Sequence, residues 1–371
     1  MPTEGNRVSS HMRSLAAFAI VAGLLAGLFV PPSAAQNNPQ PHGVPPGTPA
    51  RPAAPSAQAQ HPGRIVVPSS AVLVPVTVKD RQGSLVGGLT KEDFRIFCDN
   101  VEQVISYFSA DPFPLSAVVL VDDDLSSRQA DEVQRSLTAI AAGFGPNDEV
   151  ALVTYDQFPH LVSDFSFNND LLFTQLKRLD LNSHFSNIPD TGPMTAGPMI
   201  NGQSQATGVP TVGASINSVT KDMDDAIYEA GEMLRSRGRD RRKIIFIVTD
   251  GADSRTNDHS FDETLQLLLS NDISVYAISV GHAFLQKQTR RLEHYAQGTG
   301  GDNFYASKAG DLGRLYPTVS EQARNQYTLV FSPQDLHKDK DYHPIEVRVT
   351  RPDLTILARE GFYQPGAAVK K

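Results

Sequence analysis

The sequence predicts an α/β protein with a doubly wound, mostly parallel sheet, flanked by a small β-sandwich. Between residues 115 and 324, apolar strand-like runs alternate with amphipathic segments of helix length. This alternation is typical of parallel βαβ units. Residues 64–110 and 325–364 instead show the two-residue alternation of antiparallel strands. Because a few strands bury little surface alone, we expect these two flanking segments to form one sandwich.

In the central domain, residues 115–324, the predicted strands alternate with helices for most of its length. The predicted strands are 116–121, 149–155, 243–249, 272–280 and 302–305. The predicted helices are 127–143, 168–180, 221–237, 260–270, 284–298 and 308–324. Residues 161–165 are expected to turn back as a hairpin beside 149–155. The pattern is interrupted at 183–219, which is rich in Gly, Pro, Ser, Asn and Thr and is interpreted as a flexible insertion.

The first 63 residues are predicted to lie outside the folded part. Arg13 precedes an apolar run at 15–30, and small residues at 33–35 suit a cleavage site, so 1–35 is interpreted as a signal peptide. Residues 36–63 are rich in Pro, Gln and Ala and are interpreted as a disordered linker. The protein is therefore expected to be secreted or periplasmic, with no transmembrane segment after cleavage.

Composition limits the partners. The chain has 371 residues and a net charge of -8, which argues against nucleic acid as a partner because phosphate contacts need a basic surface. The single cysteine, Cys98, cannot form an internal disulfide and is interpreted as a small apolar strand residue.

Two predicted strands end in acidic residues. The apolar run before Asp122 is followed by Asp123 and Asp124, and the later apolar run ends at Thr249 and Asp250. Ligands of open α/β sheets bind outside the carboxyl ends of the strands. Oxygen ligands gathered there predict a pocket of the kind that holds a hard divalent cation.

These motifs resemble a known family. The sequence Asp-x-Asp-x-Ser begins at Asp122, Asp225–Tyr228 reads Asp-Ala-Ile-Tyr, and Thr249–Gly251 reads Thr-Asp-Gly. The central domain resembles the von Willebrand factor type A (VWFA) domain. With Gly88–Phe94 and Ala358–Tyr363, nearly the whole ordered chain resembles the acidobacterial VWFA-related family of secreted proteins. The resemblance implies a Rossmann-like fold and a role in binding or adhesion to a protein or cell-surface ligand.

The VWFA resemblance also implies a metal-ion-dependent adhesion site. The family uses Asp-x-Ser-x-Ser, a Thr before a middle helix and a late Asp. Carried over residue by residue, the candidate metal ligands are Asp122, Asp124, Ser126, Asp250 and Thr220. Asp124 replaces a family Ser, and the aligned Thr position falls on Lys221, one residue after Thr220.

Three interpretations of this site stay open. The residues bind Mg²⁺ or Ca²⁺, with the extra carboxylate of Asp124 favouring Ca²⁺ and weakening attraction for an acidic partner. Alternatively, the ammonium group of Lys221 lies where the ion would lie and pairs with the carboxylates. In the third interpretation the acids only end a strand, and Ser126 or Ser127 caps the next helix.

Three classes of function stay open. The first is a VWFA-type binding or adhesion module, and the second is a structural or envelope-assembly protein with a degenerate, metal-free site. A metal-dependent hydrolase is the third and is less favoured. The sequence lacks His-Glu-x-x-His, Gly-x-Ser-x-Gly and a Walker loop, and the expectation is that the protein is not an enzyme.

Overall fold

The computed structural model describes most of the chain from residue 71 onward. The described residues are 71–181, 199–200, 203–204, 221–254, 256–281, 289–306, 309–334, 336 and 340–364. The predicted signal peptide, the linker, Thr220 and most of the predicted insertion lie outside these ranges. Every described residue belongs to the compact unit that spans residues 60–371.

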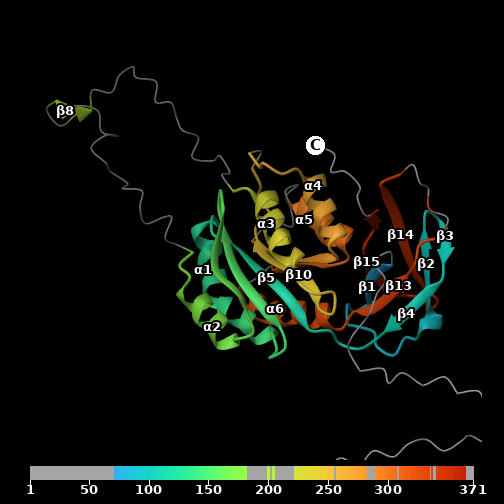
Figure 1. Ribbon diagram of the computed structural model, residues 1–371. Coiled ribbons are helices and arrows are strands. Elements are labelled where there is room, and N and C mark those ends of the chain that lie inside the picture. The colour runs from blue at the N-terminus through green and yellow to red at the C-terminus, as the bar shows by residue number, and fades with distance from the viewer. Residues whose placement is uncertain are drawn as a thin grey trace, which may run out of the picture. The chain divides into compact units, whose positions relative to one another are not determined.

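A six-stranded sheet lies at the centre of the α/β domain (Figure 1). Its strands are β5 (Leu115–Asp122), β6 (Glu149–Tyr155), β7 (Pro159–Ser166), β10 (Arg242–Thr249), β11 (Ile273–Val280) and β12 (Asp302–Ala306). The order across the sheet is β12-β11-β10-β5-β6-β7. All neighbours pair in parallel except β7, which pairs antiparallel with β6 as the predicted hairpin. This is the doubly wound order 3-2-1-4-5-6, so the predicted fold class is confirmed.

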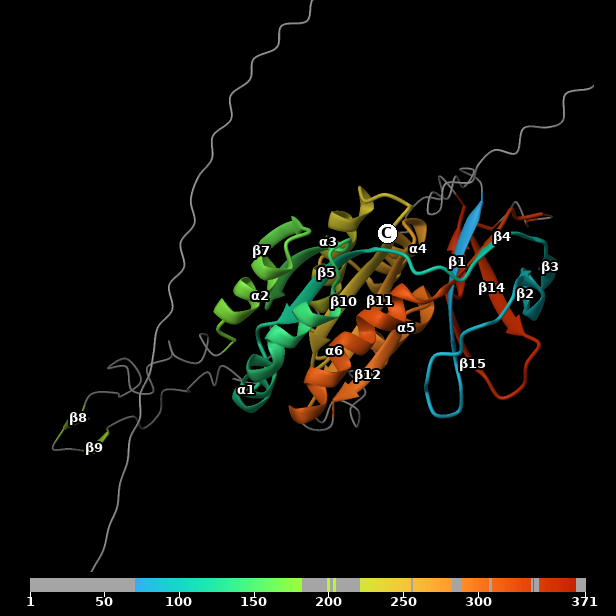
Figure 2. The ribbon, with the colours of Figure 1, turned by 90° about the horizontal axis from the view of Figure 1, so that it is seen from below.

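Helices cover both faces of this sheet (Figure 2). They are α1 (Ser127–Ser136), α2 (Asn169–Arg178), α3 (Met223–Arg235), α4 (Phe261–Ser270), α5 (Thr289–Thr299) and α6 (Ala309–Arg324). Apolar side chains of α1, α2 and α6 form the core on one face. Those of α3, α4 and α5 form the core on the other. Among the described residues, no helix has the length and apolar character needed to cross a membrane.

The predicted helix 127–143 differs from the structure in its second half. The α-helix ends at Ser136, and a 3₁₀ helix, η2, continues from Leu137 to Gly143. Helices often tighten in this way at their C-terminal ends. A Cβ atom on Gly143 would lie 2.7 Å from Ser320 Oγ and 3.3 Å from Pro317 Cα of α6. Position 143, at the end of η2, therefore lies too close to α6 for a residue larger than glycine unless α6 shifts.

The second part of the fold is a sandwich of two four-stranded sheets, ordered β15-β1-β13-β4 and β16-β14-β2-β3. Its N-terminal strands are β1 (Val72–Lys79), β2 (Phe94–Cys98), β3 (Val101–Gln103) and β4 (Ile105–Ser109), with a 3₁₀ turn η1 at Lys91–Asp93. Its C-terminal strands are β13 (Tyr327–Phe331), β14 (Tyr342–Val349), β15 (Thr355–Ala358) and β16 (Gly361–Tyr363). Each sheet mixes strands from the two flanks, as the sequence predicted. A further small pair, β8 (Met199–Ile200) and β9 (Gln203–Ser204), lies within the predicted insertion.

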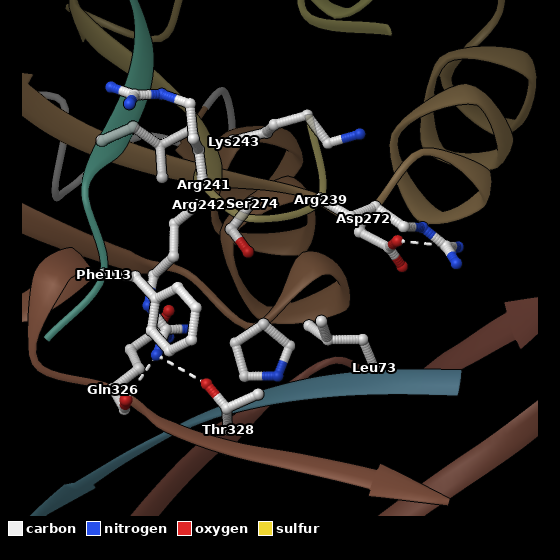
Figure 3. Close-up of a pocket in the computed structure, with 12 residues that line it drawn as sticks. Leu73, Phe113, Arg239, Arg241, Arg242, Lys243, Asp272, Ser274, Gln326 and Thr328 are labelled. Carbon is white, nitrogen blue, oxygen red and sulfur yellow. Dashed lines mark hydrogen bonds and ion pairs between the residues drawn. The ribbon is translucent and has the colours of Figure 1, made fainter. Parts of the chain in front are cut away.

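Two buried arginines join the sandwich to the α/β domain. Arg359 donates to the carbonyl of Leu269, in the last turn of α4, and, at 2.9 Å, to Asp272 Oδ1, in the link between α4 and β11. Arg242, at the start of β10, donates to Thr328 Oγ1 of β13 at 3.0 Å. Arg242, Phe113 and Thr328 line a pocket between the two parts (Figure 3). Its cavity of about 20 Å³ has room for one water molecule, so it is a packed junction and not a ligand pocket.

Candidate functional site

The carboxyl ends of β5 and β10 bring two of the predicted acids together. The two strands pair in parallel, with Val121 opposite Val248. Asp122 and Asp250 therefore follow at the same edge of the sheet, between the two strands where its winding reverses. This is where open α/β sheets form a ligand crevice.

The ammonium group of Lys221 lies between these carboxylates. Its Nζ atom is 2.9 Å from Asp122 Oδ2 and 3.2 Å from Asp122 Oδ1. It is also 2.9 Å from Asp250 Oδ1 and 2.9 Å from the backbone carbonyl oxygen of Asp124. An ammonium group has three donors, and here three residues accept them. The Lys221 side chain is only 3% exposed, and that of Asp122 is fully buried.

Asp122 is held from its other side by hydroxyl groups. Thr249 Oγ1 donates to Asp122 Oδ2 at 2.6 Å. Thr249 accepts in turn from the Tyr155 hydroxyl at 2.8 Å and from the Gly251 amide at 3.0 Å. Since a threonine hydroxyl offers one donor and two acceptor positions, its capacity is fully used. The Asp122 carboxylate is therefore completely hydrogen-bonded by this chain's own groups.

The pKa values agree with a tightly held ion pair. Burial raises the pKa of Asp122 to about 6, although the charge of Lys221 and the Thr249 hydrogen bond oppose this rise. Burial alone would lower the pKa of Lys221, but the charges of Asp122 and Asp250 outweigh it and the pKa is raised. Lys221 therefore carries its positive charge at neutral pH. As they lie, these residues do not fit a divalent cation, because a fixed ammonium group occupies the position between the carboxylates.

The other predicted ligands have different contacts. Asp124 contributes its backbone carbonyl, not its carboxylate, to Lys221. Ser126 is exposed at the N-cap of α1, where its backbone amide donates to Gln129 Oε1 at 3.1 Å. Ser126 thus fulfils the helix-cap interpretation. Thr220 lies outside the described residues.

A second cluster, which the sequence did not predict, supports the start of α3. Asp253 Oδ1 accepts from the Met223 amide at 2.9 Å, and Asp253 Oδ2 lies 3.2 Å from Arg291 of α5. Arg291 also pairs with Asp224, which accepts from the Tyr295 hydroxyl at 2.9 Å. Asp253 therefore connects the start of α3 to α5. No local motif could have paired Arg291 with acids on another helix.

The raised pKa of Asp122 predicts a specific pH dependence. Its ordinary pKa is 3.8 and its pKa in the fold is about 6. Between these values the folded protein holds a proton that the unfolded chain has released. The unfolding free energy of the wild type, relative to Asp122→Asn, therefore falls as the pH rises from about 4 to about 6. Urea denaturation of both proteins across this window measures the difference, and a flat difference would contradict the burial argument.

Among known proteins, solved structures are similar to this chain, and the similarity is one of fold. No protein-family model and no curated protein matches the chain. A von Willebrand factor type A structure from Catenulispora acidiphila is 9% identical, with a TM-score of 0.43 over 79% of this chain and 74% of that one. The conserved hypothetical protein BatB from Bacteroides thetaiotaomicron is 11% identical, with a TM-score of 0.38 over 56% of this chain and 98% of that one.

A third solved structure has metal in its site. Proximal thread matrix protein 1 from the mussel byssus, with zinc in its metal-ion-dependent adhesion site, is 16% identical with a TM-score of 0.39. The similarity covers 58% of this chain and 49% of that one. These likenesses are weak, so the class rests on the chain's own topology. By its strand order, its helix layers and its acidic strand ends, the central domain is a VWFA-like α/β domain.

Proposed function

We propose that this protein is a binding module that engages a protein or cell-surface ligand at the carboxyl-end face of its central sheet. The supporting observation is Lys221, whose ammonium group joins Asp122 and Asp250 at 2.9 Å each. In a metal-dependent adhesion site a cation holds the strand ends together. Here the lysine supplies that organisation from within the chain, so binding does not require a metal.

The charge of the site favours a basic group on the partner. Lys221 contributes one positive charge, and Asp122 and Asp250 contribute two negative charges, which leaves a net charge of -1. Asp124 adds a further half-buried carboxylate beside them. A negative surface attracts cationic side chains and repels carboxylates. The proposed partner therefore presents Lys or Arg, whereas a metal-dependent site takes a partner's acid.

Exposed apolar side chains lie near this acidic face. Phe158 and Leu161, in and after the turn from β6 to β7, are each 61% exposed. The Asp222 amide donates to the carbonyl of Asp156 at 3.0 Å, which fixes this turn beside the segment that carries Lys221. Aromatic anchors next to charged groups are typical of protein interfaces. Phe158 is the proposed apolar contact.

Metal independence can be measured directly. Titration of Mg²⁺, Ca²⁺ or Mn²⁺ into the wild type is expected to give no binding heat and no change in melting temperature. Lys221→Thr vacates the position between the carboxylates, and that variant is expected to gain a saturable rise in melting temperature with Mg²⁺ or Ca²⁺. A wild-type protein that is stabilised by any of these ions would overturn the metal-free proposal.

Partner binding is tested by capture from the envelope fraction of the source organism. Capture is expected to persist with a chelator, to weaken with salt, and to fall with Phe158→Ser or Asp124→Asn. Phe173→Ser is the matched control, because Phe173 is 45% exposed on α2, away from the strand ends. Capture that the chelator abolishes would contradict a lysine-organised site.

The alternative function is a structural or envelope-assembly protein. The burial of the Lys221 ion pairs supports it, since such a cluster also serves as a stability element. Under this alternative, Asp124→Asn and Phe158→Ser leave capture unchanged. In both cases we propose a secreted or periplasmic, non-enzymatic protein. A metal-dependent hydrolase is disfavoured because Lys221 lies where a metal would activate water.

A further inference from the structure

Three potential metal ligands meet in the β-sandwich, far in sequence from the VWFA-like site. Cys98 ends β2, Asp99 follows in the turn to β3, and His343 lies on β14, which pairs with β2. One ligand atom from each lies within 4.8 Å of the other two. The Asp99 amide donates to the carbonyl of Pro344 at 3.1 Å, which fixes the turn against β14.

The turn conformation directs the Asp99 carboxylate inward. Asp99 and Asn100 both have positive φ, 50° and 65°, as in the two-residue hairpin turns that favour Asp and Asn. The Asp99 side chain is 4% exposed and that of His343 is fully buried. Cys98 is buried beside them. A thiol, a carboxylate and an imidazole therefore share one enclosed place at the end of a hairpin.

One polar atom in this cluster has no partner. His343 Nδ1 and Asp99 Oδ2 are 2.7 Å apart, so the imidazole satisfies one carboxylate oxygen. Asp99 Oδ1 is buried and has no hydrogen-bond partner among the described residues. An unsatisfied buried acceptor costs free energy. If this cluster only fixed the hairpin against β14, the His343 contact would account for Oδ2 of Asp99 but not for Oδ1. The unpaired Oδ1 and the adjacent Cys98 thiol therefore point to a cation as their partner.

We propose that Cys98, Asp99 and His343 form a binding site for one zinc ion. Sulfur, nitrogen and carboxylate oxygen from Cys, His and Asp are the ligand types that zinc takes in proteins. A thiolate and a carboxylate together neutralise the +2 charge of the ion, which suits a buried site. A water molecule completes the four-fold coordination.

The proton balance of zinc binding follows from the contacts. In the metal-free site Cys98 is a buried free thiol. Zinc forms a bond to sulfur, and the thiol proton leaves to solvent. When His343 Nδ1 binds zinc, its proton moves to Nε2, which lies 2.9 Å from the Gln364 side-chain amide. The Gln364 carbonyl oxygen accepts this proton after the amide turns over, as partners of metal-bound histidines do.

The zinc site differs in chemistry from the Lys221 site. It offers sulfur and nitrogen, which favour zinc over Mg²⁺ or Ca²⁺. It also joins β2 from the N-terminal flank to β14 from the C-terminal flank. Bound zinc would thus link the two ends of the folded chain.

The experiment is a zinc titration of the metal-stripped chain in competition with a chelating dye. One equivalent is expected to bind, with release of one proton, and Co²⁺ is expected to give a thiolate charge-transfer band. Cys98→Ser should abolish that band, and Asp99→Asn or His343→Gln should weaken binding roughly tenfold or more. Binding should also slow modification of Cys98 by a thiol reagent.

Two controls keep the result specific. His294→Gln alters an exposed histidine on α5 and should bind zinc like the wild type. Lys221→Thr should also bind zinc unchanged, so failure of the Lys221 proposal does not affect this test. If a ligand variant fails to fold, the thiol-protection assay on the wild type still decides. No zinc binding, or binding that Cys98→Ser leaves intact, would overturn the proposal.

Discussion

Lys221→Met is expected to lower the free energy of unfolding by about 3–5 kcal/mol, as removal of one partner from a buried ion pair does. The Asp122 carboxylate is fully buried and receives two of its hydrogen bonds from Lys221. Methionine keeps the length of the apolar stem but removes the charge. The buried negative charge then remains without a counter-charge, and Asp250 loses its ion-pair partner as well. Urea denaturation at pH 7 measures the loss.

Two further variants separate charge from packing. Asp122→Asn in the Lys221→Met background should recover much of the lost stability, because the uncompensated charge is gone. Lys91→Met alters an exposed lysine and should change the unfolding free energy by less than about 0.5 kcal/mol. A loss below about 1 kcal/mol for Lys221→Met would mean that water, and not Lys221, stabilises Asp122.

Arg359→Met is expected to have an effect of similar size, about 3–5 kcal/mol. The Arg359 side chain is 3% exposed and lies 2.9 Å from Asp272 Oδ1. It also donates to the carbonyl of Gly361 at 2.8 Å and to that of Leu269. The substitution leaves Asp272 with a weaker set of partners and removes the main polar link between β15 and the α4–β11 turn. Thermal denaturation followed by circular dichroism measures the loss.

The same variant tests whether the two parts of the fold unfold together. With the link broken, limited proteolysis is expected to cleave the sandwich before the α/β domain. Arg348→Met is the matched control, because Arg348 is 59% exposed on β14, where it pairs with Glu346 and lies over the Phe97 ring. It should cost less than about 1 kcal/mol. An equal loss of unfolding free energy in the two variants would show that the buried contacts of Arg359 do not stabilise the fold.

Regular periodicity made most of the fold predictable. The strand predicted at 116–121 is Leu115–Asp122, and the helix predicted at 260–270 is Phe261–Ser270. The first is a continuous apolar run and the second an amphipathic one after a Ser cap, so local sequence specifies both. The shared sandwich was predictable because neither flank has enough strands to bury its own apolar face.

The functional contacts were less predictable because they join distant residues. Sequence placed Lys221 near the acids but left open whether a cation or its ammonium group lies between them. The answer depends on where the Nζ atom of Lys221 lies relative to Asp122, which is 99 positions away in the sequence. The contact of His343 with Asp99 spans 244 positions. From the sequence, Cys98 was interpreted only as a small apolar strand residue. Its burial agrees with that interpretation, but its proximity to His343 could not be predicted.

The mixed sandwich also sets the order in which the protein can be completed. β1 lies between β13 and β15, and β2 pairs with β14, so β1 and β2 cannot complete their pairing until these later strands have been synthesised. Contacts this distant form slowly, and the central domain has time to fold before them. A chain that stops short of β13 leaves its N-terminal strands with exposed edges, the kind of surface that aggregates or is degraded. The sandwich can therefore form only in molecules that contain both β-rich flanks.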